Sequence, residues 1–183
     1  MNLLIVETHS DKMRTRACKI IEDSIRQAYI MLRQLRYFCV FQTFLFWQGG
    51  FLFYSAVVVP TGTEVLDSAK EQGLITQRVT DWLNIIGVVW VVAFAWDLAA
   101  SGDFRRFSKR MWLWAITAVL LGVLFYLHPQ MDGLIDASGQ KVTDRPGFRT
   151  LHIVYLWVST VHWVLGLILA WLTLRTWTFL GSK

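Results

Sequence analysis

Polar side chains that could do chemistry occur inside and beside long apolar segments of this sequence, where an ionisable group is costly and usually has a task. The clearest set recurs at steps of three and four between residues 152 and 173. At about 100° per residue, such steps place side chains on one face of a helix, and here the opposite face carries large apolar residues. The set comprises His152, Tyr155, Ser159, His162, Gly166, Ala170 and Thr173.

His162 lies near the middle of this segment, where an imidazole could serve as a proton relay, a metal ligand or a haem axial ligand. A second histidine at the same depth on another segment would be needed for a bis-histidine haem, and the sequence offers none. We therefore assign no cofactor. We expect a neutral His162 that hydrogen-bonds to Tyr155, Ser159 or another helix, on a face buried against the first two apolar segments.

A second polar group stands at the ends of two apolar segments. His128 ends one segment and His152 begins the next, so both should lie at similar depth. Asp132 and Asp136 follow His128 at steps of four and share its face if the helix resumes after Pro129. Histidine and carboxylate together suit a divalent transition metal. The sequence leaves open both a metal site at His128, Asp132 and His152 and ordinary hydrogen bonding.

Asp97 lies about one turn inside the second apolar segment. A carboxylate at that depth requires a base, because an unpaired charge in lipid is expensive. Arg175, at a similar depth on the last segment, is the first candidate, and Arg105 and Arg106 are alternatives. A structural ion pair is the plain interpretation of Asp97, and coupling to proton or cation movement is the alternative.

Amide side chains add a further polar set in the first two apolar segments. Gln48 and Ser55 share a helical face and are expected to reach Asn84 or His162. The adjacent Gly49–Gly50 pair permits two helices to approach closely. Such groups either tie helices together or line a polar cavity.

Four apolar runs must position these residues, at 37–60, 82–101, 111–129 and 151–179. Each is long enough to cross the ~30 Å hydrocarbon core, which takes roughly 20 helical residues. Backbone amides in lipid must be bonded within the protein, so continuous apolar runs predict helices. The expected fold is an all-α integral membrane four-helix bundle over residues 37–183, preceded by a cytoplasmic amphipathic helix within residues 1–36.

Punctuating residues predict where the bundle helices begin and end. Pro60, followed by a Thr-Gly-Thr turn, predicts the end of the first span. A short surface helix is expected over 64–70, and Thr80 with Asp81 should cap the second span, which ends at Ser101-Gly102. Residues 130–149 are expected to form an irregular link or a small hairpin.

The segment before the first span has one apolar face over residues 10–35. A basic helix of this kind, just ahead of a span, most simply lies in the headgroup region. A docking surface for a partner subunit is the alternative. Its apolar residues recur at three and four, and they are Met13, Ala17, Ile20, Ile21, Ile25, Ala28, Leu32 and Leu35.

The basic residues indicate the topology. Of the 18 Lys and Arg residues, 13 lie before the first run, between the second and third, or in the C-terminal tail. By the positive-inside rule, both termini and the 102–110 link face the cytoplasm, and we expect a multi-pass protein of a bacterial inner membrane. The surplus of +5 is thus a topology signal and predicts no nucleic-acid partner. The expected partners are membrane lipids and either other membrane subunits or further copies of the chain.

Two stretches resemble a bacterial family of small four-helix membrane proteins, within a superfamily of unknown function that includes small eukaryotic transmembrane proteins. The first is Trp-Gln-Gly-Gly-Phe at 47–51, leading to Val-Val-Val-Pro at 57–60. The second is Phe-Arg-Thr-Leu-His at 148–152. The likeness covers roughly residues 37–175. It implies the four-helix fold and its orientation, and it supplies no catalytic residue.

The motifs exclude several reaction classes. The sequence contains no recognisable nucleophile–base pair, phosphate loop or cysteine–histidine metal motif. We therefore expect a non-enzymatic membrane protein, a structural or accessory subunit of a larger membrane assembly. A small oligomeric transporter or channel for ions or small solutes is the alternative, followed by a haem- or metal-binding redox protein.

Overall fold

The computed structural model describes residues 3–66, 69–106, 108–135 and 142–181, with side chains for 16, 18–66, 71–105, 108–135 and 142–178. The chain divides into two compact units, Met1–Cys39 and Val40–Lys183. The described residues are helical apart from short turns and one isolated antiparallel bridge between Ile135 and Val142. Each unit is considered by itself below.

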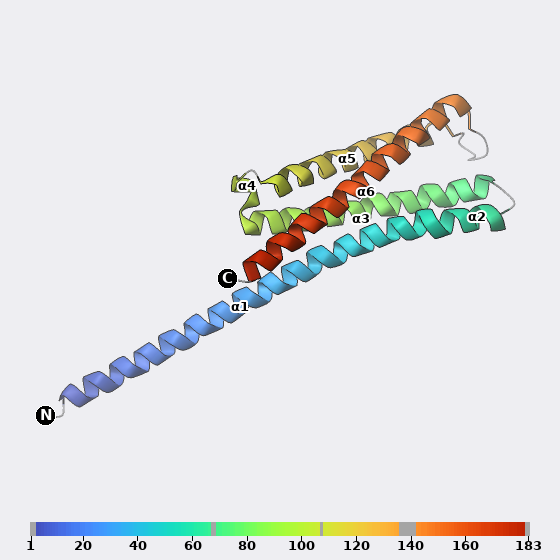
Figure 1. Cartoon of the computed structure of the whole chain (residues 1–183). Helices are drawn as coiled ribbons and strands as arrows, with labels where there is room; N and C mark the ends of the chain where they lie inside the picture. Colours follow the sequence, from blue (N-terminus) through green and yellow to red (C-terminus); the bar gives the residue numbers. More distant parts are fainter. Residues whose placement is uncertain (1–2, 67–68, 107, 136–141, 182–183) are drawn as a thin grey trace. The chain divides into compact units, whose positions relative to one another are not determined.

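Helices follow one another along the whole chain (Figure 1). Stretches long and apolar enough to cross a membrane lie within Cys18–Val65, Glu71–Ser101, Lys109–Asp132 and Arg145–Thr178. The predicted all-α fold with four membrane-spanning candidates is therefore confirmed. In chain order, the elements are α1 (Leu3–Phe53), the π-helix η1 (Tyr54–Val58), α2 (Val59–Val65), α3 (Ala69–Ser101), α4 (Asp103–Arg106), α5 (Lys109–Asp132) and α6 (Arg145–Gly181).

The helical path of the first run does not stop at Pro60, so that prediction is wrong. Pro60 has no N–H, and its ring disfavours the regular helical bond to the preceding turn. The chain responds with one wider turn, η1, in which the Val59 N–H bonds to the Tyr54 carbonyl. Helix α2 then carries on to Val65. Proline has widened the helix here and has not ended it.

Helix α3 begins at Ala69, well before the predicted cap at Thr80 and Asp81, and the predicted 64–70 helix is also wrong. The early residues of α3 are mostly good helix formers, and the Thr76 hydroxyl donates to the Gln72 carbonyl within the helix (2.8 Å). The other end is as predicted. Gly102 takes a positive φ of 74° directly after Ser101 and ends α3.

Helix α5 starts at a side-chain cap and continues through a proline. The Ser108 hydroxyl oxygen accepts from the Met111 N–H (3.2 Å). Pro129 lies inside the helix, which runs on to Asp132. The Thr143 N–H bonds to the Leu134 carbonyl (2.8 Å), and Ile135 and Val142 form an antiparallel bridge. Of the predicted 130–149 link, the two ends are helical, and residues 136–141 lie outside the described residues.

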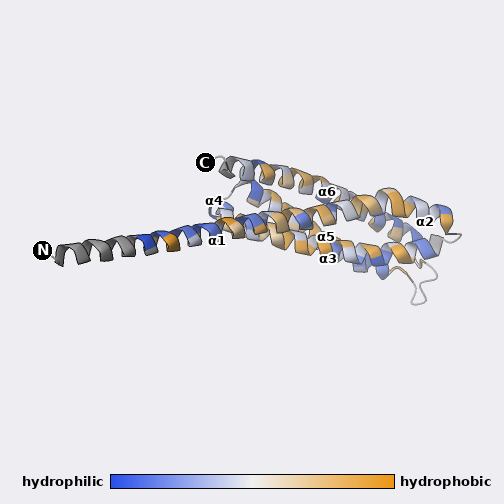
Figure 2. Ribbon diagram, turned by 90° about the horizontal axis from the view of Figure 1, so that it is seen from below, coloured by the Kyte–Doolittle hydropathy of each residue, from blue (hydrophilic) through white to orange (hydrophobic). Residues whose placement is uncertain are grey.

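The second unit packs around aromatic rings in its middle. Within it, α5 lies beside both α3 and α6, and the last part of α1 contributes buried side chains to the same core. Many large apolar side chains of α3, α5 and α6 are exposed, and much of the ribbon of these helices has hydrophobic colouring (Figure 2). An apolar exterior is what a bundle presents to lipid. The core comprises Val40, Phe44, Trp47, Trp90, Val91, Phe94, Leu121, Leu169 and Ala170.

Candidate functional site

The predicted polar face of α6 is buried. Tyr155, Ser159, His162 and Thr173 are all buried, whereas apolar residues of the opposite face, such as Trp157, are exposed. His152, at the start of this face, is half-buried and stacks on Phe148 with ring centroids 6.0 Å apart. The 3.6-residue periodicity therefore placed the interior face of this helix correctly.

His162 lies against a pair of stacked tryptophans in the middle of the bundle. Trp47 of α1 and Trp90 of α3 are parallel within 3°, with ring centroids 4.8 Å apart. The imidazole meets both indoles edge-on, at 4.8 Å from Trp47 and 5.6 Å from Trp90. His162 thus contacts the first two spans, as predicted. It is only 1% exposed.

Several buried polar atoms in this unit have no hydrogen-bond partner in the described part of the chain. They include Nε2 of His162, Nε1 of Trp90 and both amide atoms of Gln48. The predicted hydrogen bond of the His162 imidazole is therefore not seen at Nε2. Most buried polar groups in proteins are paired, and leaving one unpaired costs about 1–3 kcal/mol. These atoms therefore have spare capacity to bond to water or to another group.

Gln48 and Ser55 do not act together as predicted. Ser55 is exposed, and its hydroxyl donates to the carbonyl of Phe51 in its own helix (2.8 Å). Gln48 is buried without a partner among the described residues. Of the neighbouring glycines, Gly50 lies against the Leu83 side chain, whereas Gly49 faces open space.

Polar contacts continue from His162 toward the end of the bundle that holds His128, which we call the His128 end. One turn from Ser159, the Tyr155 hydroxyl donates to Oδ1 of Asn84 on α3 (3.2 Å). The Tyr155 ring also contacts the imidazole of His128 on α5, with centroids 6.2 Å apart. Three helices thus supply one column of polar side chains, "the polar column": His128, Asn84, Tyr155, Ser159 and His162.

At the His128 end, the imidazole lies between two carboxylates. Nδ1 of His128 is 3.4 Å from an oxygen of Asp81 on α3 and 3.4 Å from an oxygen of Asp132, one turn along α5. The predicted common face of His128 and Asp132 is confirmed, while Asp136 lies outside the described residues. His152 is not part of this group. Among the described side chains, no three His, Cys, Asp or Glu are arranged to hold a metal ion.

The opposite end of the bundle, which we call the Asp97 end, contains a buried ion-pair network. Asp97 pairs with the guanidinium of Arg110, the second residue of α5. The same guanidinium donates to Asp103 (2.6 Å) and through Nε to the Thr173 hydroxyl (3.1 Å). The Trp177 indole N–H reaches both oxygens of Asp97 at 3.3 Å. Helices α3, α4, α5 and α6 therefore meet at one arginine.

The predicted pairing of Asp97 with Arg175 is wrong. Arg175 is exposed, and among the described bases the one within ion-pair distance of Asp97 is Arg110. Of the alternatives, Arg105 is exposed, and the side chain of Arg106 lies outside the described residues. The sequence did hold a signal for Arg110. It shares a face, at steps of four and three, with residues buried along α5, namely Thr117, Leu121, Leu124 and His128.

An apolar layer separates the polar column from the Asp97 network. His162 and Thr173 are 11 residues apart on α6, which is about 16 Å along a helix. Between them lie Leu169 and the Trp90 and Phe94 rings, and all three side chains are fully buried. The column therefore leads from the His128 end to His162 and is closed beyond it.

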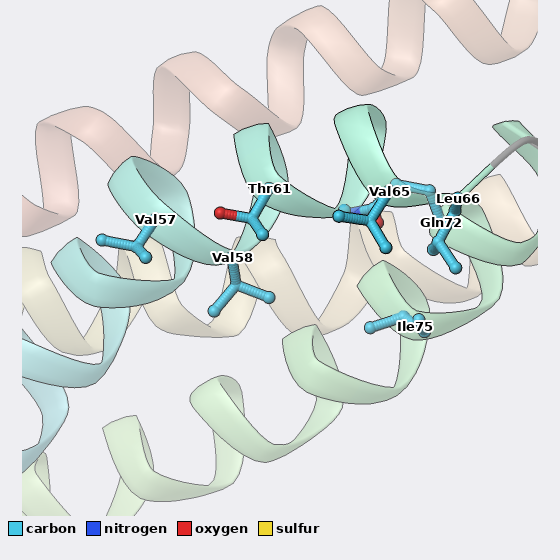
Figure 3. Close-up of a pocket in the computed structure, with 8 residues that line it drawn as sticks. Val57, Val58, Thr61, Val65, Leu66, Gln72 and Ile75 are labelled. Atoms are coloured by element: carbon cyan, nitrogen blue, oxygen red, sulfur yellow. The ribbon is translucent and has the colours of Figure 1, made fainter.

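A separate groove of about 350 Å³ lies between η1, α2 and the start of α3 (Figure 3). Val57, Val58, Thr61 and Val65 line one side, and Gln72 and Ile75 come from α3. Gln72 is buried with both amide atoms unpaired among the described residues. Its Oε1 lies against Gly62, where an added Cβ would come within 1.8 Å. A side chain at position 62 would therefore require the Gln72 amide to move.

No family model matches the chain, and no curated protein or solved structure matches it significantly.

Proposed function

We propose that this protein is a non-enzymatic, multi-pass membrane protein that carries protons across the membrane by way of the centre of its bundle, as a small gated transporter. One observation carries the proposal. Both amide atoms of Gln48 and Nε2 of His162 are buried in the middle of the bundle without partners among the described residues. A purely structural bundle gains nothing from unpaired polar groups, whereas groups that exchange protons or water need spare bonding capacity.

The order of groups along the polar column supports a proton as the cargo. His128, with its two carboxylates, stands at the entrance, and the Tyr155–Asn84 hydrogen bond and Ser159 follow. Each of these side chains can both donate and accept a proton or a hydrogen bond, except the carboxylates in their ionised form. His162 ends the series, and an imidazole can bind a proton at one ring nitrogen and release one from the other.

The apolar layer around Trp90, Phe94 and Leu169 supports a gated protein and argues against an open pore. A proton at His162 faces about 16 Å of helix with buried apolar neighbours before Thr173. Passage to the Asp97 end therefore requires these helices to part. In this proposal the Arg110 network holds the far end of the bundle shut.

Proton flux into proteoliposomes tests the proposal. Vesicles loaded with a pH-sensitive dye receive an external acid pulse, with potassium and valinomycin present to balance charge. We expect internal acidification several-fold faster than in protein-free vesicles. His162→Phe should return the rate to background, and Ser159→Ala should lower it.

The matched control is Thr160→Ala. Thr160 lies on the exposed face of α6, and its hydroxyl donates to its own helix at the Leu156 carbonyl (2.8 Å). The control should therefore keep the wild-type flux. Wild-type flux equal to that of empty vesicles, or full flux in His162→Phe, would refute the proposal.

A second candidate function is that of a structural or accessory subunit in a larger membrane assembly. The exposed apolar side chains of Ile21, Ile25, Leu32 and Leu35 in the first unit favour it, because they offer a helical docking face. Recovery of a stable hetero-complex from native membranes, together with absent proton flux, would favour this candidate. In both cases we place the chain in a bacterial inner membrane with both termini in the cytoplasm, on the distribution of its basic residues.

A further inference from the structure

We infer that the first unit, Met1–Cys39, is a dimerisation helix that pairs in parallel with the same segment of a second copy of this chain. The pairing surface, which we call the seam, lies on one side of α1. Its residues follow one another at steps of three and four, and they are Cys18, Ile21, Ile25, Ala28, Leu32, Leu35 and Cys39.

The spacing of the seam selects a helical partner. Steps of 3-4-3-4-3-4 make an average period of 3.5 residues, which keeps one stripe of side chains facing a second helix as the two supercoil. Residues 18–39 provide three such heptads, about 33 Å of helix. Long apolar side chains in the seam stand largely exposed: Ile21 at 60%, Ile25 at 65%, Leu32 at 59% and Leu35 at 52%.

The charge pattern makes a second copy an acceptable partner. Two identical basic helices would repel one another if their charges met across the contact. The seam itself carries no charged residue. Two rows of charged residues, each spaced by seven, point away from the partner in a parallel pair. One row is Lys19, Arg26 and Arg33, and the other is Arg16 and Asp23. In a parallel pair, each seam residue therefore faces the same residue of the second copy, and these facing residues are uncharged.

Membrane anchoring favours the parallel arrangement. Copies inserted by the same topology rule have the same orientation, so their first helices run in the same direction. The spans also confine both copies to one plane, which raises the effective concentration of each seam for the other. In this register Cys18 of one copy faces Cys18 of the other.

Thiol crosslinking of the full-length protein in proteoliposomes tests the pairing. In a Cys39→Ser background, Cys18 is the only cysteine and lies on the seam. A short bismaleimide should convert a large share of this protein into covalent dimers. The matched control combines Cys18→Ser with Asp23→Cys, which moves the thiol to an exposed site on the other face. Its dimer yield should be at least several-fold lower at every protein-to-lipid ratio.

Charge insertion provides a second measurement. Ile25→Glu with Leu32→Glu places two carboxylates in the seam and should abolish the Cys18 crosslink. Gln27→Glu with Gln34→Glu adds the same charges on the exposed outer face and should leave it unchanged. Equal yields from Cys18 and Asp23→Cys would indicate random collision and overturn the inference. So would a monomer whose seam is quenched by lipid-phase probes, the result expected if the seam lies on the membrane surface.

Discussion

Arg110 shows how a single side chain can join several helices at the end of a bundle. Its three guanidinium nitrogens each have a different acceptor: Thr173 for Nε, Asp103 for one terminal nitrogen and Asp97 for the other. Only arginine offers such a planar fork with fixed donor directions. The Arg110 cation thus offsets the negative charge of two carboxylates, and the carboxylates in turn offset the buried positive charge.

Removing this arginine should be far more costly than removing the exposed one. Arg110→Met leaves Asp97 and Asp103 close together without the cation between them, and breaking a buried pair in this way costs about 3–5 kcal/mol. Arg175→Met should change the unfolding free energy by less than about 0.5 kcal/mol, because Arg175 is exposed. Unfolding in mixed detergent micelles measures both.

A double-mutant cycle isolates the pair. Asp97→Leu combined with Arg110→Met should recover part of the loss, since no lone carboxylate remains at position 97. Equal losses for Arg110→Met and Arg175→Met, or strictly additive effects in the cycle, would contradict direct pairing.

The residues of the candidate site were predictable to different degrees. Helical periodicity alone identified Tyr155, Ser159 and His162 as interior, because one helix face is a local property. The partner of Asp97 depends on how helices rotate against one another, which no local pattern specifies. Arg110 also stands beside Lys109 in a basic link, so its charge suggested topology and concealed its burial.

At the scale of helices, two glycines set how closely α6 and α3 approach the Trp47 ring of α1. A Cβ on Gly166 would lie 3.2 Å from the Trp47 ring and 3.4 Å from the Trp90 ring. A Cβ on Gly87 of α3 would lie 3.2 Å from the indole nitrogen of Trp47. Trp47 is therefore wedged between two helices that touch it through glycine.

Gly166→Ala should push the tryptophan stack apart and destabilise the bundle by about 1–3 kcal/mol, the usual cost of overpacking a core. Gly49→Ala is the matched control. No atom lies within 4 Å of its added Cβ, so the change should be neutral or stabilise by up to about 1 kcal/mol. Thermal unfolding followed by tryptophan fluorescence compares the two. Equal stability of the Gly166→Ala and Gly49→Ala proteins would contradict this prediction, because it would mean that the tryptophan rings move aside without a loss of stability.

Helix existence could be predicted from the sequence, but helix ends could not. Four long apolar runs required four helices in any membrane fold. Pro60 and the Thr80-Asp81 pair looked like end signals, yet both lie inside helical segments. A π-turn absorbs the proline, and good helix formers before Thr80 extend α3. End signals are weak preferences that neighbouring residues can outweigh.

At the scale of the whole chain, the second unit has an apolar exterior and a partly polar interior. Ten polar or charged residues are buried among the described residues, including both members of the Asp97–Arg110 pair. The two buried charges are paired, as fully buried charges in proteins nearly always are. The apolar exterior suits a lipid environment, and the polar column and the ion-pair network account for most of the buried polar residues.

Orientation in the membrane follows from the basic residues and can be measured by labelling. In a background without Cys18 and Cys39, single cysteines are placed at Arg105 in α4 and at Ser138 in the link before α6. Ser138→Cys should react with an impermeant maleimide on intact cells, and Arg105→Cys only after the cells are opened. Reaction of both positions from outside would reverse the assignment of the two ends.

The pairing of Asp97 with Arg110 also bears on how the chain is made. The two residues are 13 positions apart, fewer than one span, so they leave the ribosome almost together. Helix α3 alone would bring an uncompensated carboxylate into the translocon, whereas the start of α5 delivers its counter-ion moments later. We therefore expect α3 and α5 to enter the lipid as one hairpin during synthesis. A chain divided within the 102–108 link would leave an unmatched charge on each half, and neither half should insert efficiently without the other.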